Sequence, residues 1–233
     1  ARAIARYTEK SKGSTLLSGT APGSHVLYYF RAVLYWFKVL CEPPVLKENG
    51  VQVMTGEMKQ LSFSSKAQRD TALCILSSSL FAMDYVVHSS CQVVNSPDLQ
   101  FPADIADLAN RHGQTLSRLS DTLVKDVQAN SQVQTREYST RGRAYTMSKQ
   151  YFYFKHSKPI IDEIDALLAK HYGLTEEELD HVINYDIKYR MGDELEGEDA
   201  GDAAPAEPKA TKTKPPKAKA TAKGSKPDPD PFV

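Results

Sequence analysis

Short apolar and aromatic runs dominate residues 24 to 63, and turn-forming residues separate them. Glu42-Pro-Pro44 and Asn49-Gly50 are typical of turns between strands. The runs alternate or contain β-branched and aromatic side chains, as strands do. This pattern predicts a small antiparallel sheet with strands at His25–Phe30, Leu34–Leu40, Val51–Met54 and Gln60–Phe63.

From Ser65 onward the apolar positions follow a helical period. Between Ala72 and Tyr85 they cover most of the helix circumference, which predicts a largely buried helix at about 66 to 89 with Ser64 or Ser65 as its N-cap. A short extended piece at 91–101 follows. Apolar residues then recur on one side through 103–130, which predicts a long amphipathic helix.

Residues 136 to 158 follow neither a helical nor a strand period cleanly. A last pair of helices is expected after them. Pro159 suits the first turn of a helix that ends at Gly173. Thr175 and Glu178 have the spacing of a capping box, which starts the next helix.

The expected fold class is therefore α+β, with a small antiparallel sheet packed against long helices. We expect four segments: a sheet with long helices at 1–135, a basic aromatic segment at 136–158, a C-terminal helix pair at 159–190, and a disordered charged tail at 191–233. The tail holds 7 of the 13 prolines and little apolar surface. Either it keeps the protein soluble or it contacts nucleic acid as a flexible polycation.

Composition excludes a protein that is basic all over. The 233 residues include 29 Lys and Arg against 29 Asp and Glu. No stretch approaches the roughly 18 consecutive apolar residues of a membrane span, and no signal-peptide pattern opens the chain. We therefore expect a cytoplasmic protein with no membrane partner. The chain opens on Ala1 in a basic stretch, and we expect it to be a fragment of a longer protein.

Neutrality conceals opposed blocks of charge. Residues 1–69 hold 10 basic and 4 acidic residues, and residues 136–158 hold 6 and 1. Residues 159–190 reverse the balance, with 3 basic and 8 acidic residues. Nucleic-acid contacts should therefore be sought in particular segments, although neighbouring blocks of opposite sign could also neutralise each other.

The strongest candidates for nucleic-acid contact lie in the basic aromatic segment. Lys and Arg neutralise phosphates, Arg reads guanine edges, and Tyr bonds to the backbone or stacks. The candidates there are Arg136, Arg141, Arg143, Tyr145, Lys149 and Lys155. A solvated loop followed by a half-buried strand would explain the same pattern. Arg31 and Lys38, beside aromatic strands, form a second cluster, although such strands more often belong to a core.

Several candidate catalytic motifs lack residues that their chemistry requires. The three cysteines make no ligand or disulfide spacing, and no glycine-rich turn follows an apolar strand. Glu42-Pro-Pro-Val45 lacks the amide and the aromatic ring of an amino-group methyltransferase motif. Glu57-Met-Lys59 lacks the upstream Asp of a metal-dependent nuclease. We therefore expect no catalytic residues, metal or bound cofactor in this chain.

Two segments carry a resemblance to a known family. The run from Lys158-Pro-Ile-Ile-Asp-Glu-Ile-Asp to Tyr185-Asp-Ile-Lys-Tyr-Arg-Met-Gly192 resembles the C-terminal signature of large bacterial N6-adenine DNA methyltransferases of restriction-modification and related phage-defence systems. Leu76-Ser-Ser-Ser-Leu-Phe81 resembles a helix of their target-recognition region, with Ser in place of the usual Asn. The likeness extends more loosely over residues 14–192.

The resemblance implies a DNA target-recognition and accessory region that grips double-stranded DNA. It also implies an upstream catalytic domain, which would bind S-adenosylmethionine and methylate a flipped adenine. This chain would bind and the parent enzyme would catalyse. The alternative is a protein-interaction module of a multi-subunit assembly, in which the acidic final helices neutralise the basic segment.

Overall fold

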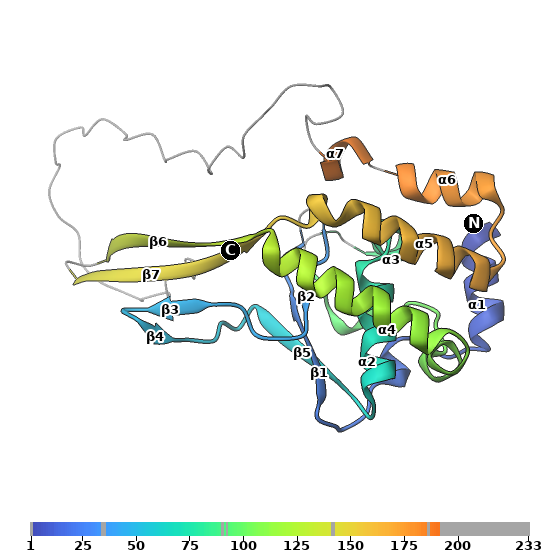
Figure 1. The fold of residues 1–233 in the computed structure, drawn as a ribbon, viewed down its shortest axis with the longest axis horizontal. Helices are drawn as coiled ribbons and strands as arrows, with labels where there is room; N and C mark the ends of the chain where they lie inside the picture. Colours follow the sequence, from blue (N-terminus) through green and yellow to red (C-terminus); the bar gives the residue numbers. More distant parts are fainter. Residues whose placement is uncertain are drawn as a thin grey trace, which may run out of the picture.

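The computed structural model describes residues 2–33, 36–89, 91, 93–140, 143–185 and 187–191. It confirms the α+β class: two antiparallel sheets are attached to a body of helices (Figure 1). The helices are α1 (Arg2–Ser11), α2 (Lys66–Ser77), α3 (Ser79–His88), α4 (Ile105–Ala129), α5 (Lys158–Tyr172), α6 (Glu176–Asn184) and α7 (Ile187–Met191). Short 3-10 turns lie at η1 (Leu17–Gly19), η2 (Ser96–Leu99) and η3 (Phe154–Ser157).

The first sheet has the order β2-β1-β5 and lies against the helical body. Its central strand, β1 (His25–Phe30), pairs antiparallel with β2 (Val39–Leu40) and with β5 (Met58–Phe63). Leu27 and Phe63 are completely buried under α2, so one face of this sheet is core. The strand expected at Leu34–Leu40 is described from Trp36 onward and is a strand only at Val39–Leu40.

The second sheet has the order β4-β3-β7-β6. Its long hairpin consists of β6 (Ser131–Thr140) and β7 (Arg143–Phe152), paired along their whole length. The short hairpin of β3 (Leu46–Glu48) and β4 (Val51–Gln52) turns at Asn49-Gly50, where both residues have positive φ. Figure 1 shows both hairpins extending away from the helices.

This second sheet corrects two sequence-based expectations. The predicted strand at Val51–Met54 does not join the first sheet, because Val51–Gln52 pairs with β3, which in turn pairs with β7. Residues 136–158, which follow no clean period, are mostly a strand hairpin that begins at Ser131, so the expected boundary at 135/136 falls inside β6. The period is obscured because a projecting hairpin carries polar residues on both faces.

The core lies between the first sheet and helices α2 to α5. It includes a run of aromatic rings, in which Phe101 contacts Tyr7, Phe81 and Tyr172. Tyr7 comes from α1. The basic N-terminal stretch, for which no element was predicted from the sequence, is thus a helix that packs beside α5. The expected extended piece at 91–101 contains η2.

The predicted helix at 66–89 is divided at Ser78. Ser65 caps α2 as expected, through a hydrogen bond from the Gln68 amide to its hydroxyl. Ser78 has extended backbone and accepts from the Phe81 amide, so it caps α3. The two axes differ by 62°. Periodicity missed the break because apolar residues continue on both sides of it.

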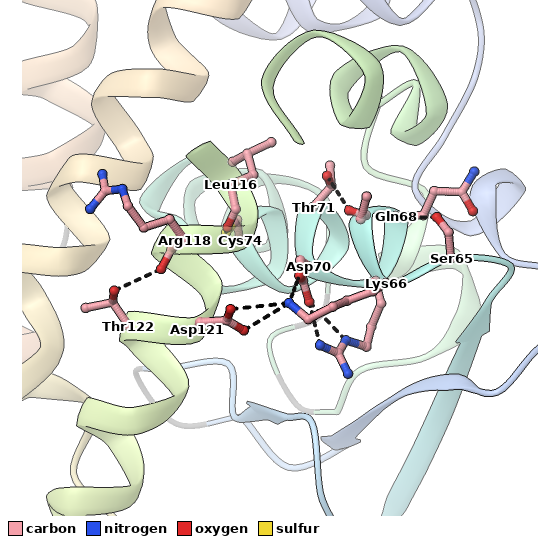
Figure 2. Close-up of polar contacts among 12 residues, drawn as sticks. Ser65, Lys66, Gln68, Asp70, Thr71, Cys74, Leu116, Arg118, Asp121 and Thr122 are labelled. Atoms are coloured by element: carbon pink, nitrogen blue, oxygen red, sulfur yellow. Dashed lines mark hydrogen bonds and ion pairs between the residues drawn. The ribbon is translucent and has the colours of Figure 1, made fainter. Parts of the chain in front are cut away.

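Helices α2 and α4 are joined by a charged network around Asp70 (Figure 2). Asp70 is fully buried and accepts from Lys66 at 2.6 Å and from the Arg69 guanidinium at 2.6 Å. Lys66 also bonds to Asp121 on α4 at 3.0 Å. Burial alone would raise the pKa of Asp70, but hydrogen bonds from Lys66, Arg69 and Ser117 outweigh burial and hold it below its ordinary value.

The end of the described chain follows the sequence signals closely. Helix α5 begins at Lys158 and stops at Gly173, whose φ of +71° suits glycine. Thr175 and Glu178 form the predicted capping box at the start of α6. The tail expected at 191–233 lies outside the described residues beyond Met191. In the described part of the chain no single helix is long and apolar enough to cross a membrane, and α2 with α3 match in length and composition only when taken together as a bent pair.

Candidate nucleic-acid interface

The four-stranded sheet has one face that concentrates basic and tyrosine side chains. Side chains alternate along a strand, and directly opposed residues of antiparallel strands share a face. Tyr138 opposes Tyr145, Arg136 opposes Met147, and Leu46 opposes Lys149. We call this side the basic face, defined by Arg136, Tyr138, Arg143, Tyr145, Lys149 and Tyr151.

The opposite face of the same sheet has no such excess of positive charge. Its charged residues within the strands are Lys47 and Glu137, which balance each other. The basic face carries Arg136, Arg143 and Lys149 against Glu48. The strand register therefore places three of the four basic residues of this sheet on one face. A count of charges along the sequence does not show this.

Aromatic contacts give the basic face a fixed surface. Tyr138 and Tyr145 stack across the two strands with ring centroids 5.5 Å apart and planes 20° apart. The Lys149 ammonium lies 5.6 Å from the Tyr151 ring centroid. Arg136 donates to the Gln134 side chain at 3.2 Å. Arg136, Tyr138 and Arg143 are exposed, so this surface is accessible to a partner.

The positive charges of the basic face are not neutralised within the described chain. Among residues the structure places, no carboxylate forms an ion pair with Arg136, Arg143 or Lys149. Lys158 behaves differently, because it pairs with Asp162 one turn along α5. Among the described residues, α5 thus neutralises Lys158 and none of the three cations of the basic face.

The base of the basic face opens into a cleft of about 140 Å³ between the two sheets. Lys149 and Tyr151 line it from β7, and Lys38 lines it from the segment before β2. Its walls are largely apolar. They are made by Phe30, Pro44, Val45, Leu46, Val53, Met58 and Phe152, together with Ala32, Thr55, Glu57 and Gln150.

Burial and like charge both act on the amines of this cleft. Burial lowers the pKa of Lys38, and the nearby Lys149 ammonium lowers it further. Burial also lowers the pKa of Lys149. Neither lysine has a carboxylate partner among the described residues, so an anion in the cleft would relieve the repulsion between them.

The structure brings together some of the predicted contact residues and separates others. Arg136, Arg143, Tyr145 and Lys149 share the basic face, and Lys38 joins them at its base. Arg31 is directed elsewhere, since its guanidinium donates to Asn95 at 3.1 Å.

Of the two remaining predicted residues, the structure describes only Lys155. Lys155 lies in η3, beyond the end of β7 and next to the helical body. Arg141 falls between the described ends of β6 and β7 and lies outside the described residues. Neither can be assigned a contact on the basic face.

Sequence reasoning missed the cleft altogether. Its walls come from five separate stretches between Phe30 and Phe152, which strand pairing in both sheets brings together. Tyr138 and Tyr151 were visible as members of an aromatic run, but their common face depends on the register of the hairpin. A strand period through 131–152 would have been the usable signal.

No cluster of His, Cys, Asp and Glu in the described ranges could hold a metal ion. Comparison of the sequence with protein-family models, curated proteins and solved structures gives no match.

Proposed function

We propose that this chain binds double-stranded DNA through the basic face of its four-stranded sheet. The observation that carries the proposal is the sorting of Arg136, Arg143 and Lys149 onto one face, without carboxylate partners among the described residues. Phosphate contacts of this kind supply most of the affinity of a protein for DNA. The stacked tyrosines add hydrogen-bonding hydroxyls beside the cations.

The shape of the long hairpin supports the same proposal. The major groove of B-DNA, about 12 Å wide, admits a two-stranded β-ribbon. Strands β6 and β7 are ten residues each, and because β3 pairs with β7 only at Met147–Lys149, the outer part of the hairpin beyond Met147 is two-stranded. The ribbon projects from the helical body, so its outer part can approach a duplex without a clash with the helices (Figure 1).

The resemblance adds a more specific proposal about biological role. We propose that the chain serves as the target-recognition region of an N6-adenine DNA methyltransferase. Ser79 of one resembling segment receives a hydrogen bond from Arg190 of the other at 3.0 Å, and its amide donates to Asp165 at 2.8 Å. These contacts lie in the helical body, away from the basic face. The chain would position DNA, and S-adenosylmethionine chemistry would belong to an upstream catalytic domain.

A salt titration tests the DNA-binding proposal. The affinity for a labelled duplex would be measured by fluorescence anisotropy at salt concentrations from about 50 to about 200 mM, because phosphate contacts weaken strongly over this range. With three cations on phosphates, log Kobs should fall against log salt with a slope of about −2.7. Absence of binding at the lowest salt, or a slope near zero, would contradict the proposal and favour a protein-interaction module.

A further inference from the structure

The cleft between the two sheets combines positive charge with aromatic surface, and a single class of ligand could bind to both. Lys38 and Lys149 outnumber Glu57, the one carboxylate of the lining, and neither lysine forms an ion pair among the described residues. Phe30, Tyr151 and Phe152 provide aromatic wall. A ligand with an anionic group attached to a planar ring would neutralise the lysines and cover the aromatic surface.

The volume of the cleft limits the size of the ligand that it can bind. A volume of about 140 Å³ is well below the roughly 300 to 1,000 Å³ that enclose a drug-sized ligand. We therefore expect the cleft to take a single nucleobase rather than a base pair. The anionic group would remain near the lysines at the partly open side.

We propose that this cleft binds a single unstacked nucleotide, with its base against the aromatic wall and its phosphate at Lys38 and Lys149. The proposal deepens the proposed function and rests on it for the nucleic-acid source of the ligand. Lys149 and Tyr151 belong both to the basic face and to the cleft. A strand that follows the basic face toward the helical body therefore reaches the cleft at its end.

Two kinds of molecule could supply this nucleotide. An unpaired nucleotide of a DNA strand and a free nucleoside monophosphate both carry a phosphate and a planar base. Binding of the base costs the unstacking energy only in the first case, which is a few kcal/mol in a regular duplex and less at an unpaired position. A duplex with one unpaired nucleotide should therefore bind more tightly than the fully paired duplex.

The test uses adenosine monophosphate, adenosine and inorganic phosphate as probes of the whole chain, by calorimetry. Adenosine monophosphate should bind at least tenfold more tightly than either of the other probes. Lys38→Gln and Lys149→Gln should each weaken its binding about tenfold, and Lys38→Arg should restore most of it. Lys59→Gln is the matched control, because Lys59 is exposed on β5 and does not line the cleft.

Competition against a labelled duplex separates this proposal from the proposed function. If the cleft binds a nucleotide, the wild type should bind a duplex with one unpaired nucleotide more tightly than the fully paired duplex. Lys38→Gln should bind the two duplexes equally. Equal affinity for paired and unpaired duplexes, together with no adenosine monophosphate binding, would overturn the cleft proposal and leave duplex binding by the basic face intact. Adenosine monophosphate binding that Lys38→Gln and Lys149→Gln both leave unchanged would also overturn it.

Discussion

Tyr138 and Tyr145 stack directly across β6 and β7, with ring centroids 5.5 Å apart. They lie on the basic face between Arg136 and Arg143, so the cations flank an aromatic pair. Such a pair is a firm surface for a sugar-phosphate backbone or a base. It also stabilises the hairpin, by roughly 0.2 to 1 kcal/mol for a cross-strand pair of this kind.

We expect Tyr138→Ala to weaken DNA binding by about 1 kcal/mol or more while the salt dependence stays the same, because no cation is removed. Val133→Ala is the matched control: it lies on the same strand and on the opposite face, and it is also exposed. Anisotropy titrations at two salt concentrations measure both quantities. Equal losses for the two variants would indicate damage to the hairpin rather than loss of a contact.

The Asp70 network should contribute strongly to the stability of the helical body. Asp70→Asn removes the buried carboxylate, and because Lys66 is half exposed and can be hydrated, we expect a loss of roughly 1.5 to 3 kcal/mol in the free energy of unfolding. Asp107→Asn is the control, because Asp107 pairs with Arg111 at the surface and should cost within about 1 kcal/mol. Urea unfolding at pH 7 gives both values. A loss at Asp70 no larger than the control would contradict the structural assignment.

Asp165 should make stability depend on pH in the opposite sense to most carboxylates. Burial raises its pKa to about 6, although hydrogen bonds from Ser79 and the charge of Arg190 oppose this. The folded state therefore holds the proton more tightly than the unfolded chain. The stabilisation from that proton is complete below an unfolded pKa of about 4 and is lost as pH rises through about 6.

Asp165→Asn keeps an acceptor for the Ser79 amide and removes this titration. Relative to wild type, the variant should gain about 2 kcal/mol in the free energy of unfolding between pH 4 and pH 7. Chemical denaturation of both proteins across that range measures the difference. A difference that does not change with pH would show that Asp165 has an ordinary pKa in the folded protein.

Sequence reasoning predicted the helical body better than the sheets. Gly173 and the Thr175–Glu178 box mark helix ends through local chemistry, so these signals can be read without tertiary structure. The break at Ser78 was hidden because the apolar pattern continues on both sides, and the contact of Ser79 with Asp165 depends on a helix far away in sequence.

The candidate interface shows the same limit. Arg136, Arg143 and Lys149 were identifiable from their residue types and their aromatic neighbours. Their common face requires the β6–β7 register, and the meeting of Lys38 with Lys149 requires β3 to pair with β7. Long-range strand pairing is set by the whole fold, so residue types alone could not distinguish Lys38 from Arg31.

The most direct test of DNA binding by the basic face compares two variants of one sheet. Arg136→Gln/Arg143→Gln removes two exposed cations from the basic face, and Lys47→Gln removes one from the opposite face. We expect the double variant to reduce the steepness of the salt dependence by about 2 and to lower duplex affinity severalfold or more. Lys47→Gln should change neither quantity. Equal effects of the two variants, or an unchanged salt slope in the double variant, would contradict DNA binding by the basic face.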